Sequence, residues 1–182
     1  MIERFIRFAD RLSLASGVLA AAMIAVSILV VCEMIVVRYL LDRSTIWQTE
    51  FVTYMMLSAT LVGMPYVQRL RGHVNVDLLP HYLGGRARAV LATAVLLLSL
   101  GVAGLFAVYG YGFWHEAWAG DWKSDTVWGV RLWLPYAAVP IGFALYSLQL
   151  LADLLGLLAG RSRPFDLPDK PLGEPSGGPA GQ

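Results

Sequence analysis

The longest uncharged stretch of the chain runs from Ala89 to Trp114 and reads AVLATAVLLLSLGVAGLFAVYGYGFW. An α-helix needs about 20 apolar residues to cross the hydrocarbon core of a bilayer, and this stretch exceeds that length. The strands of a transmembrane β-barrel are about 10 residues long and alternate strictly between apolar and polar residues. The stretch is too long and too uniform for such strands, so it predicts an α-helical membrane protein.

The composition of the whole chain favours the same class. Of its 182 residues, 57% are hydrophobic and 15% are charged, and the mean hydropathy is +0.60. A soluble domain carries about 25% charged residues and avoids apolar patches of the size that this composition would expose. The net charge of +1 excludes a strongly basic nucleic-acid-binding protein and an acidic disordered chain. The single cysteine, Cys32, excludes a disulfide framework and a cysteine-based zinc site.

Three further apolar runs complete the membrane domain. The sequence predicts an all-α integral membrane protein with four transmembrane helices, at about 12–37, 50–67, 88–114 and 132–158. Pro65 and Pro140, which fall inside spans, are compatible with membrane helices when neighbouring groups satisfy the freed carbonyl. We expect the first run to be retained rather than cleaved, because it is longer than the apolar region of a signal peptide, about 7–15 residues.

The distribution of basic residues predicts the orientation. One set of flanks carries nine of them: Arg4, Arg7, Arg11, Arg69, Arg71, Arg86, Arg88, Arg161 and Arg163. The other set carries four: Arg38, Arg43, Lys123 and Arg131. Because short cytoplasmic loops are enriched in Lys and Arg, both termini are expected to be cytoplasmic.

All six tryptophans fall in or beside the two loops that this orientation places outside: Trp47, Trp114, Trp118, Trp122, Trp128 and Trp133. Three of them, Trp114, Trp118 and Trp122, recur every four residues and would share one helical face. Tryptophan is typical of the headgroup level of a membrane. It is also typical of interface hot spots. The pattern therefore indicates either a membrane anchor belt or a surface that docks a partner.

Two segments differ from the spans. Within the inner loop 68–88, Asp77 can cap a short helix that begins at Leu78, and we expect this helix to lie in the cytoplasmic membrane interface. Residues 164–182 are rich in proline and glycine and are expected to form a disordered tail. The sequence thus divides into a membrane domain, 1–163, and a tail, 164–182.

Ionisable side chains are absent from the predicted mid-membrane positions. Glu33 and Glu50 lie toward the outer ends of their helices, and Asp153 lies toward an inner end. An acid at mid-membrane would indicate a transport path or a proton relay. The three histidines, His73, His81 and His115, fall in loops or at interfaces, which argues against haem ligation. With no metal-spaced cluster, phosphate loop or catalytic motif, we expect neither an enzyme nor a bound cofactor.

The spans instead carry small residues at intervals of four, which allow close helix packing. These are Gly17, Ala21 and Ala25 in the first span, Ser99, Ala103 and Ala107 in the third, and Ala138 and Gly142 in the fourth. They indicate a subunit that packs against other helices rather than one that conducts.

A set of short motifs carries a family resemblance. The sequence reads Arg38-Tyr39, then Trp47-Gln48-Thr49-Glu50, then Gly63, then Arg71-Gly72-His73-Val74-Asn75-Val76-Asp77, then Lys123-Ser124, Pro135 and Pro140-Ile141-Gly142. This pattern resembles the small membrane subunit of tripartite ATP-independent periplasmic (TRAP) transporters, the DctQ type. Thr49 stands where the family often has the first of two acids.

The resemblance implies a place in the bacterial inner membrane and a set of partners. A periplasmic binding protein would capture an organic acid, commonly a carboxylate, and a large multi-span permease subunit would carry it with sodium ions. The small subunit would be a scaffold that packs on the large subunit, contacts lipid and helps to dock the binding protein. A stand-alone four-helix assembly or anchor protein without a transport role stays open as the alternative.

Ten residues follow as candidates for structural or partner contacts: Arg38, Trp47, Glu50, His73, Asp77, Trp118, Trp122, Lys123, Trp128 and Arg131. Arg38 would either extend its guanidinium to the interface or pair with Glu33, Glu50 or a lipid phosphate. His73 and Asp77 would share a helical face and cap the inner loop. The remaining loop residues lie where a periplasmic partner would land.

Overall fold

The computed structural model describes residues 2–70 and 85–159, and these residues form helices and connecting loops. The helices in chain order are α1 (Ile2–Leu40), α2 (Ile46–Arg69), α4 (Gly85–Ala119), α5 (Trp133–Tyr136) and α6 (Ala138–Leu158). Within these ranges, β-pairing is limited to one isolated bridge between Lys123 and Arg131. The prediction of an all-α protein is confirmed.

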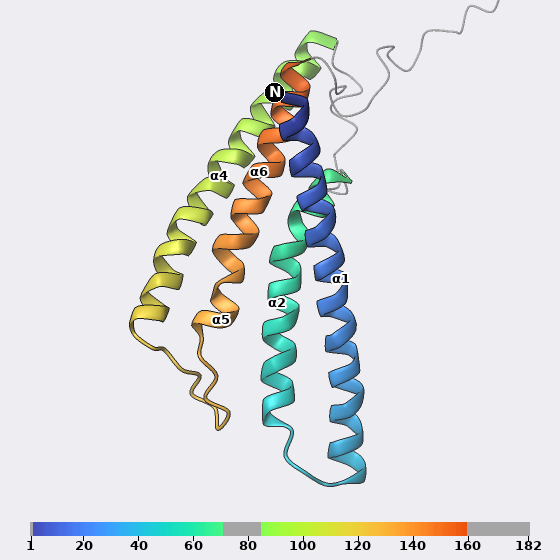
Figure 1. The fold of residues 1–182 in the computed structure, drawn as a ribbon, viewed down its shortest axis with the longest axis vertical. Helices are drawn as coiled ribbons and strands as arrows, with labels where there is room; N and C mark the ends of the chain where they lie inside the picture. The colour runs from blue at the N-terminus through green and yellow to red at the C-terminus, as the bar shows by residue number, and fades with distance from the viewer. Residues whose placement is uncertain (1, 71–84, 160–182) are drawn as a thin grey trace, which may run out of the picture.

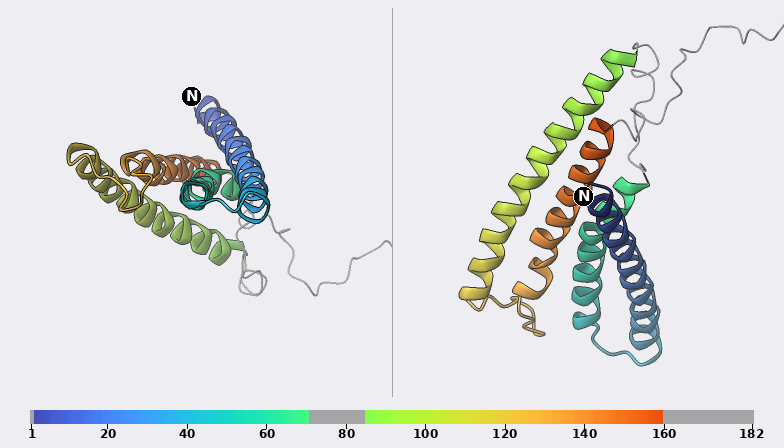
Figure 2. Two further views of the ribbon diagram at one scale, coloured as in Figure 1. Left: turned by 90° about the horizontal axis from the view of Figure 1, so that it is seen from below. Right: turned by 45° about the horizontal axis from the view of Figure 1, so that its top comes forward.

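The long helices form two antiparallel pairs. α1 packs against α2, α4 packs against α6, and α2 and α6 join the pairs at the centre. Figure 1 shows the resulting spatial order α4, α6, α2, α1, and the views in Figure 2 show the two pairs diverging from each other. α1 and α4 begin at the same end of the molecule, which is also where α6 ends.

Three of the four predicted spans are long and apolar enough to cross a membrane: Glu3–Leu40, Ala87–Ala119 and Trp133–Leu158. Their 38, 33 and 26 residues correspond to roughly 57, 50 and 39 Å of helix, against a hydrocarbon core of about 30 Å. α2, with 24 residues, is not among them. It is more polar than the other three, because it carries threonine, serine and glutamine side chains along its length.

The small-residue faces pack as expected in α4 and α6. Ala103 of α4 is 2% exposed, and Ala138 and Gly142 of α6 are buried. A Cβ atom on Gly142 would lie 2.6 Å from the carbonyl oxygen of Leu61, so α6 and α2 approach backbone to backbone there. Glycine is required at this contact because any side chain would push the helices apart.

The packing face expected for α1 was wrong in part. Gly17 does lie at a close helix contact, because a Cβ atom there would overlap Cγ of Tyr66 in α2. Ala21 and Ala25 are exposed, and the buried seam of α1 instead consists of Ala9, Ser13, Ser16, Ala20 and Ser27. Residues four apart drift by about 40° around a helix of 3.6 residues per turn, so a strict interval of four leaves the interface. Alternating intervals of three and four keep the seam on one face.

Pro140 accounts for the break between α5 and α6. It has no N–H to donate to the carbonyl of Tyr136, so the helical hydrogen bonding is interrupted at Ala137. The backbone stays close to helical there, and Ile141 N donates to Ala137 O at 3.3 Å. The two helices therefore act as one membrane-spanning rod.

Candidate functional site

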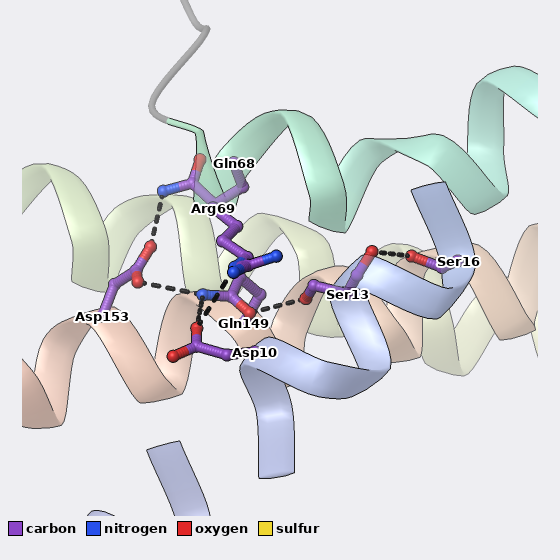
Figure 3. Close-up of polar contacts among 7 residues, drawn as sticks. All are labelled: Asp10, Ser13, Ser16, Gln68, Arg69, Gln149 and Asp153. Atoms are coloured by element: carbon purple, nitrogen blue, oxygen red, sulfur yellow. Dashed lines mark hydrogen bonds and ion pairs between the residues drawn. The ribbon is translucent and has the colours of Figure 1, made fainter. Parts of the chain in front are cut away.

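Gln149 of α6 lies at the centre of a polar cluster between three helices, which Figure 3 shows in close-up. This inner polar cluster consists of Asp10, Ser13 and Ser16 from α1, Gln68 and Arg69 from α2, and Gln149 and Asp153 from α6. Gln149 is only 1% exposed. A buried amide is costly unless its donors and acceptor are satisfied.

The amide of Gln149 is fully used. Its Oε1 accepts a hydrogen bond from Ser13 Oγ at 2.6 Å, and its Nε2 donates to Asp153 Oδ1 at 3.1 Å and to Asp10 Oδ1 at 3.4 Å. Asp153 in turn accepts from Gln68 Nε2 at 2.9 Å, while Arg69 Nε lies 4.0 Å from Asp10 Oδ1. These contacts fix the positions of α1, α2 and α6 relative to one another.

Asp153 was expected to be an acid near a helix end, whereas a role for Gln149 was not predicted. One signal was available, because Gln149 is the only amide side chain in the apolar run 132–152 and lies one helical turn before Asp153. Its main partner, Ser13, is 136 residues away. Among the described residues, no group of three or more His, Cys, Asp or Glu side chains is arranged to hold a metal ion.

At the other end of the molecule, Glu33 of α1 faces Gln48 of α2. Gln48 is 2% exposed, and its Nε2 donates to both carboxylate oxygens of Glu33, at 3.3 and 3.5 Å. The Oε1 of Gln48 has no hydrogen-bond partner among the described residues. This contact joins α1 and α2 near their loop.

Glu50, in the first turns of α2, contacts a distant loop. Its Oε1 accepts a hydrogen bond from Tyr54 Oη at 2.8 Å, and its Oε2 accepts one from Thr126 Oγ1 in the loop between α4 and α5. Arg38 lies exposed in the last turn of α1, and within the described ranges it pairs with neither Glu33 nor Glu50. The ion pair between Arg38 and Glu33 or Glu50, which was one interpretation of Arg38, is therefore not formed in the structure.

The tryptophans divide into separate contacts. Trp114 and Trp118 pack at 5.4 Å between ring centroids, but Trp122 does not continue their helical face. α4 ends at Ala119, and Asp121 has a φ of 43°, so the chain reverses before Trp122.

The helix end follows a known capping pattern. Asp121 N donates to Trp118 O at 3.2 Å, and Trp122 N donates to Ala117 O at 3.0 Å, as in a Schellman motif. Trp122 instead packs against Phe113, with ring centroids 5.8 Å apart. The expectation of one face shared by three tryptophans was wrong because the every-four spacing continues past the end of the helix.

The remaining outer-loop residues lie close together. Lys123 Nζ and Arg131 Nε lie 3.5 and 3.6 Å from the carboxylate of Asp121, and all three side chains are more than half exposed. Trp128 of the same loop packs against Trp47 of α2, with ring centroids 6.3 Å apart. The loop thus brings together five of the ten candidates: Trp47, Glu50, Lys123, Trp128 and Arg131.

Two candidates, His73 and Asp77, lie outside the described residues, as do the expected interfacial helix and the tail. Trp118, at the end of α4, is 56% exposed.

Comparison with known proteins identifies the family to which the chain belongs. The family model described as "Tripartite ATP-independent periplasmic transporters, DctQ component" matches residues 27–160. The chain belongs to the DctQ family. The resemblance inferred from the sequence motifs is confirmed.

Two DctQ proteins are similar to the chain in sequence. One is the C4-dicarboxylate TRAP transporter small permease protein DctQ of Vibrio cholerae serotype O1, 24% identical over 148 residues that cover 70% of this chain and 64% of that protein. The other is the protein of the same name from Pseudomonas aeruginosa, 26% identical over 132 residues that cover 71% of this chain and 63% of that protein. The match spans slightly less than two thirds of each relative.

Membership of the DctQ family makes this chain a protein of the bacterial inner membrane, and the family itself consists of transporter components rather than enzymes. The matched region contains the outer-loop contacts and the α2 and α6 parts of the inner polar cluster. Asp10 and Ser13 precede the matched region.

Proposed function

We propose that the chain is the small scaffold subunit of a sodium-coupled, binding-protein-dependent transporter for organic acids, with carboxylates as the substrate class. The observation that carries this proposal is the DctQ family match over residues 27–160. The names of both relatives, which refer to C4-dicarboxylates, support the substrate class.

The proposed topology has four spans, with α2 as the second. α1 and α4 begin at the same end of the molecule, and both are long enough to span. A chain that crosses the membrane in α1 must return before α4 can cross in the same direction. α2 runs antiparallel to α1 and packs against both α1 and α6. Its Gln48 is buried, and its exposed Thr53 and Thr60 donate hydrogen bonds to backbone carbonyls of their own helix. At 24 residues it measures roughly 36 Å, which is enough for the return.

The proposed orientation has both termini in the cytoplasm, with 1–163 as the membrane domain and 164–182 as a cytoplasmic tail. The support is the excess of arginine in the flanks at the start of α1 and around the loop between α2 and α4. The short segment after Asp77 would lie in the inner interface. The loop that contains Lys123 and Arg131 would then face the periplasm.

The proposed scaffold role rests on the surfaces of the outer helices. α1 and α4 expose long apolar faces, with Leu29 and Leu98 exposed by 68% and 71%. Such faces suit lipid and the helices of a large permease subunit. The polar side chains between helices are engaged with one another in the inner polar cluster, which is consistent with a fixed support.

The proposal predicts that genes for a large permease subunit and a binding protein lie beside the gene of this chain, and co-expression with them tests it. The chain should co-purify with a membrane protein of many spans, and vesicles containing both should take up an organic acid when binding protein and a sodium gradient are supplied. Vesicles that contain this chain alone should take up none. Uptake by the chain alone, or full uptake by the large subunit without it, would contradict the scaffold role. Absence of any co-purifying permease would favour the stand-alone anchor protein.

A further inference from the structure

The loop between α4 and α5 is anchored to the start of α2 through Thr126. The hydroxyl of Thr126 donates to one carboxylate oxygen of Glu50, and the hydroxyl of Tyr54 donates to the other at 2.8 Å. Hydrogen bonds to an ionised carboxylate are stronger than those between neutral groups. Glu50 therefore connects the loop to α2 at a defined point.

A second contact lies two residues further along the loop. Trp128 packs against Trp47, one helical turn before Glu50, with ring centroids 6.3 Å apart and an interplanar angle of 58°. Thr126 and Trp128 are thus both held against α2. Val127, between them, is 92% exposed, the largest value among the large apolar side chains described. The two anchors leave Val127 at the tip of the loop.

The loop also has its own internal bracing. Gly129 N donates to Thr126 O at 3.0 Å and closes a turn with Val127 and Trp128 at its centre, while Gly129 has a φ of 59°. Below the turn, Ser124 N donates to Val130 O at 2.9 Å, and the Lys123–Arg131 bridge continues the pairing. A preformed loop loses little conformational entropy when a partner binds.

The charges around the loop argue against burial of the tip in lipid. Lys123, Asp121 and Arg131 form two ion pairs within the loop, and their side chains are 58%, 57% and 61% exposed. Charged groups in the hydrocarbon region are costly. α4 is also long enough to carry its last turns, and the loop after them, to the headgroup level or beyond.

We propose that Val127, together with the exposed faces of Trp47 and Trp128, is a rigid apolar anchor for a soluble protein partner. We call these three residues the outer knuckle. The partner would offer an apolar pocket whose rim complements Lys123, Asp121 and Arg131. Glu50 is a positioning residue, because it acts on the partner only by holding Thr126. This inference deepens the proposed function and rests on it, since the soluble partner is the periplasmic binding protein.

The bracing can be tested without any partner. In a Cys32→Ser background, the substitutions Val127→Cys and Val67→Cys introduce two cysteines, and each is labelled with a spin label. The distribution of distances between the two labels is then measured in lipid nanodiscs. Val67 is exposed at the far end of α2, about 25 Å along the helix axis from Glu50. The distribution should be narrow, should broaden with Glu50→Ala or Thr126→Val, and should stay narrow with Thr126→Ser, which retains the hydroxyl. An unchanged distribution in both disruptive variants would overturn the positioning role.

The anchor is tested in the complex reconstituted with the proposed large subunit, by uptake measured against the concentration of the purified binding protein. Val127→Asp should raise the half-saturating concentration about tenfold or more, because an unpaired charge would be buried at the contact. Ser44→Asp is the matched control, since it adds the same charge to an exposed position in the other outer loop and should change the value less than about twofold. Glu50→Ala should raise the half-saturating concentration with little change in maximal uptake.

The outcomes separate the inference from the function on which it rests. If wild-type uptake needs no binding protein, the proposed function fails and the anchor fails with it. If uptake needs the binding protein but Val127→Asp behaves like Ser44→Asp, only the anchor is wrong. If Val127→Asp instead prevents co-purification of the large subunit, the outer knuckle contacts that subunit, and the inference is overturned.

Discussion

The hydroxyl of Ser13 donates a 2.6 Å hydrogen bond to Gln149 Oε1, which joins the first helix of the chain to the last. Ser13 is 3% exposed and Gln149 is 1% exposed, so water cannot replace either partner. Because Gln149 also bonds Asp10 and Asp153, one amide connects α1 to α6 and, through Gln68, to α2. The relative position of three helices therefore depends on this contact.

Replacing Gln149 should destabilise the membrane domain. Gln149→Leu leaves the buried Ser13 hydroxyl without an acceptor and removes a donor from two carboxylates, at an expected cost of about 1–3 kcal/mol. Ser13→Ala should cost about 1 kcal/mol. The measurement is the midpoint of thermal unfolding in mild detergent. Ser147→Ala is the control, because Ser147 Oγ bonds the carbonyl of Phe143 in its own helix and, among the described residues, joins no other helix. Equal midpoints for Gln149→Leu and Ser147→Ala would contradict the joining role of Gln149.

Adding a methyl group at the α2–α6 crossing should push these helices apart. In Gly142→Ala the new Cβ would lie 2.6 Å from the Leu61 carbonyl oxygen, which is backbone and cannot rotate away. We expect a loss of about 1–3 kcal/mol in the free energy of unfolding. Gly104→Ala is the matched control, since a Cβ there meets nothing within 4 Å and alanine favours the helix by up to about 1 kcal/mol. The two variants should differ in detergent stability, and similar values would argue against close helix approach at Gly142.

Reporter fusions test the four-span topology. A fusion after Gly120 should be active for a periplasmic reporter, and one after Ser162 for a cytoplasmic reporter, because a single span separates the two positions. A third fusion after Ser44 should match the one after Gly120, since α1 and α4 begin at the same end of the molecule. If the Ser44 and Gly120 fusions report opposite sides, α2 does not return across the membrane.

Reversing the charges of the outer loop should weaken coupling to the binding protein. Lys123→Glu with Arg131→Glu should raise the half-saturating concentration of binding protein, most strongly at low ionic strength, where charges steer association. Membrane insertion and association with the large subunit should be retained, because both residues lie outside the helices.

The structure requires a further control for this variant, since both residues pair with Asp121. Asp121→Asn removes those pairs without reversing either charge, and should have the smaller effect. If Asp121→Asn shifts the half-saturating concentration equally, the effect comes from loop conformation rather than from charge complementarity. If the double variant leaves the concentration unchanged at normal yield, Lys123 and Arg131 do not contribute to docking.

Features that depend on local composition could be predicted from the sequence. The three long apolar helices follow from runs without charge, and the buried Ala103 and Gly142 follow from small residues within them. The family follows from motifs such as Trp47 to Glu50, which carry specific residues at fixed spacing. Each of these signals lies within a short segment of the chain.

Features that depend on where segments meet could not be predicted. The partner of Glu50, Thr126, is 76 residues away in a loop without regular structure. The place of Trp122 depended on where α4 ends, which the left-handed backbone at Asp121 determines. The seam of α1 depended on which face meets α2 and α6, and its serines were indistinguishable in sequence from lipid-facing ones.

The distance in sequence between Ser13 and Gln149 also sets an order of events during synthesis. At about 5–20 residues per second, the 136 residues between them take roughly 7–27 s to translate. In the later part of this interval α1 and α2 are complete, but the hydroxyl of Ser13 has no acceptor on α6 and the amide of Gln68 has no carboxylate from Asp153. Polar groups at a lipid-facing helix surface attract any available donor or acceptor. These polar groups of the nascent hairpin therefore gain their partners on α6 only when the last helix enters the membrane.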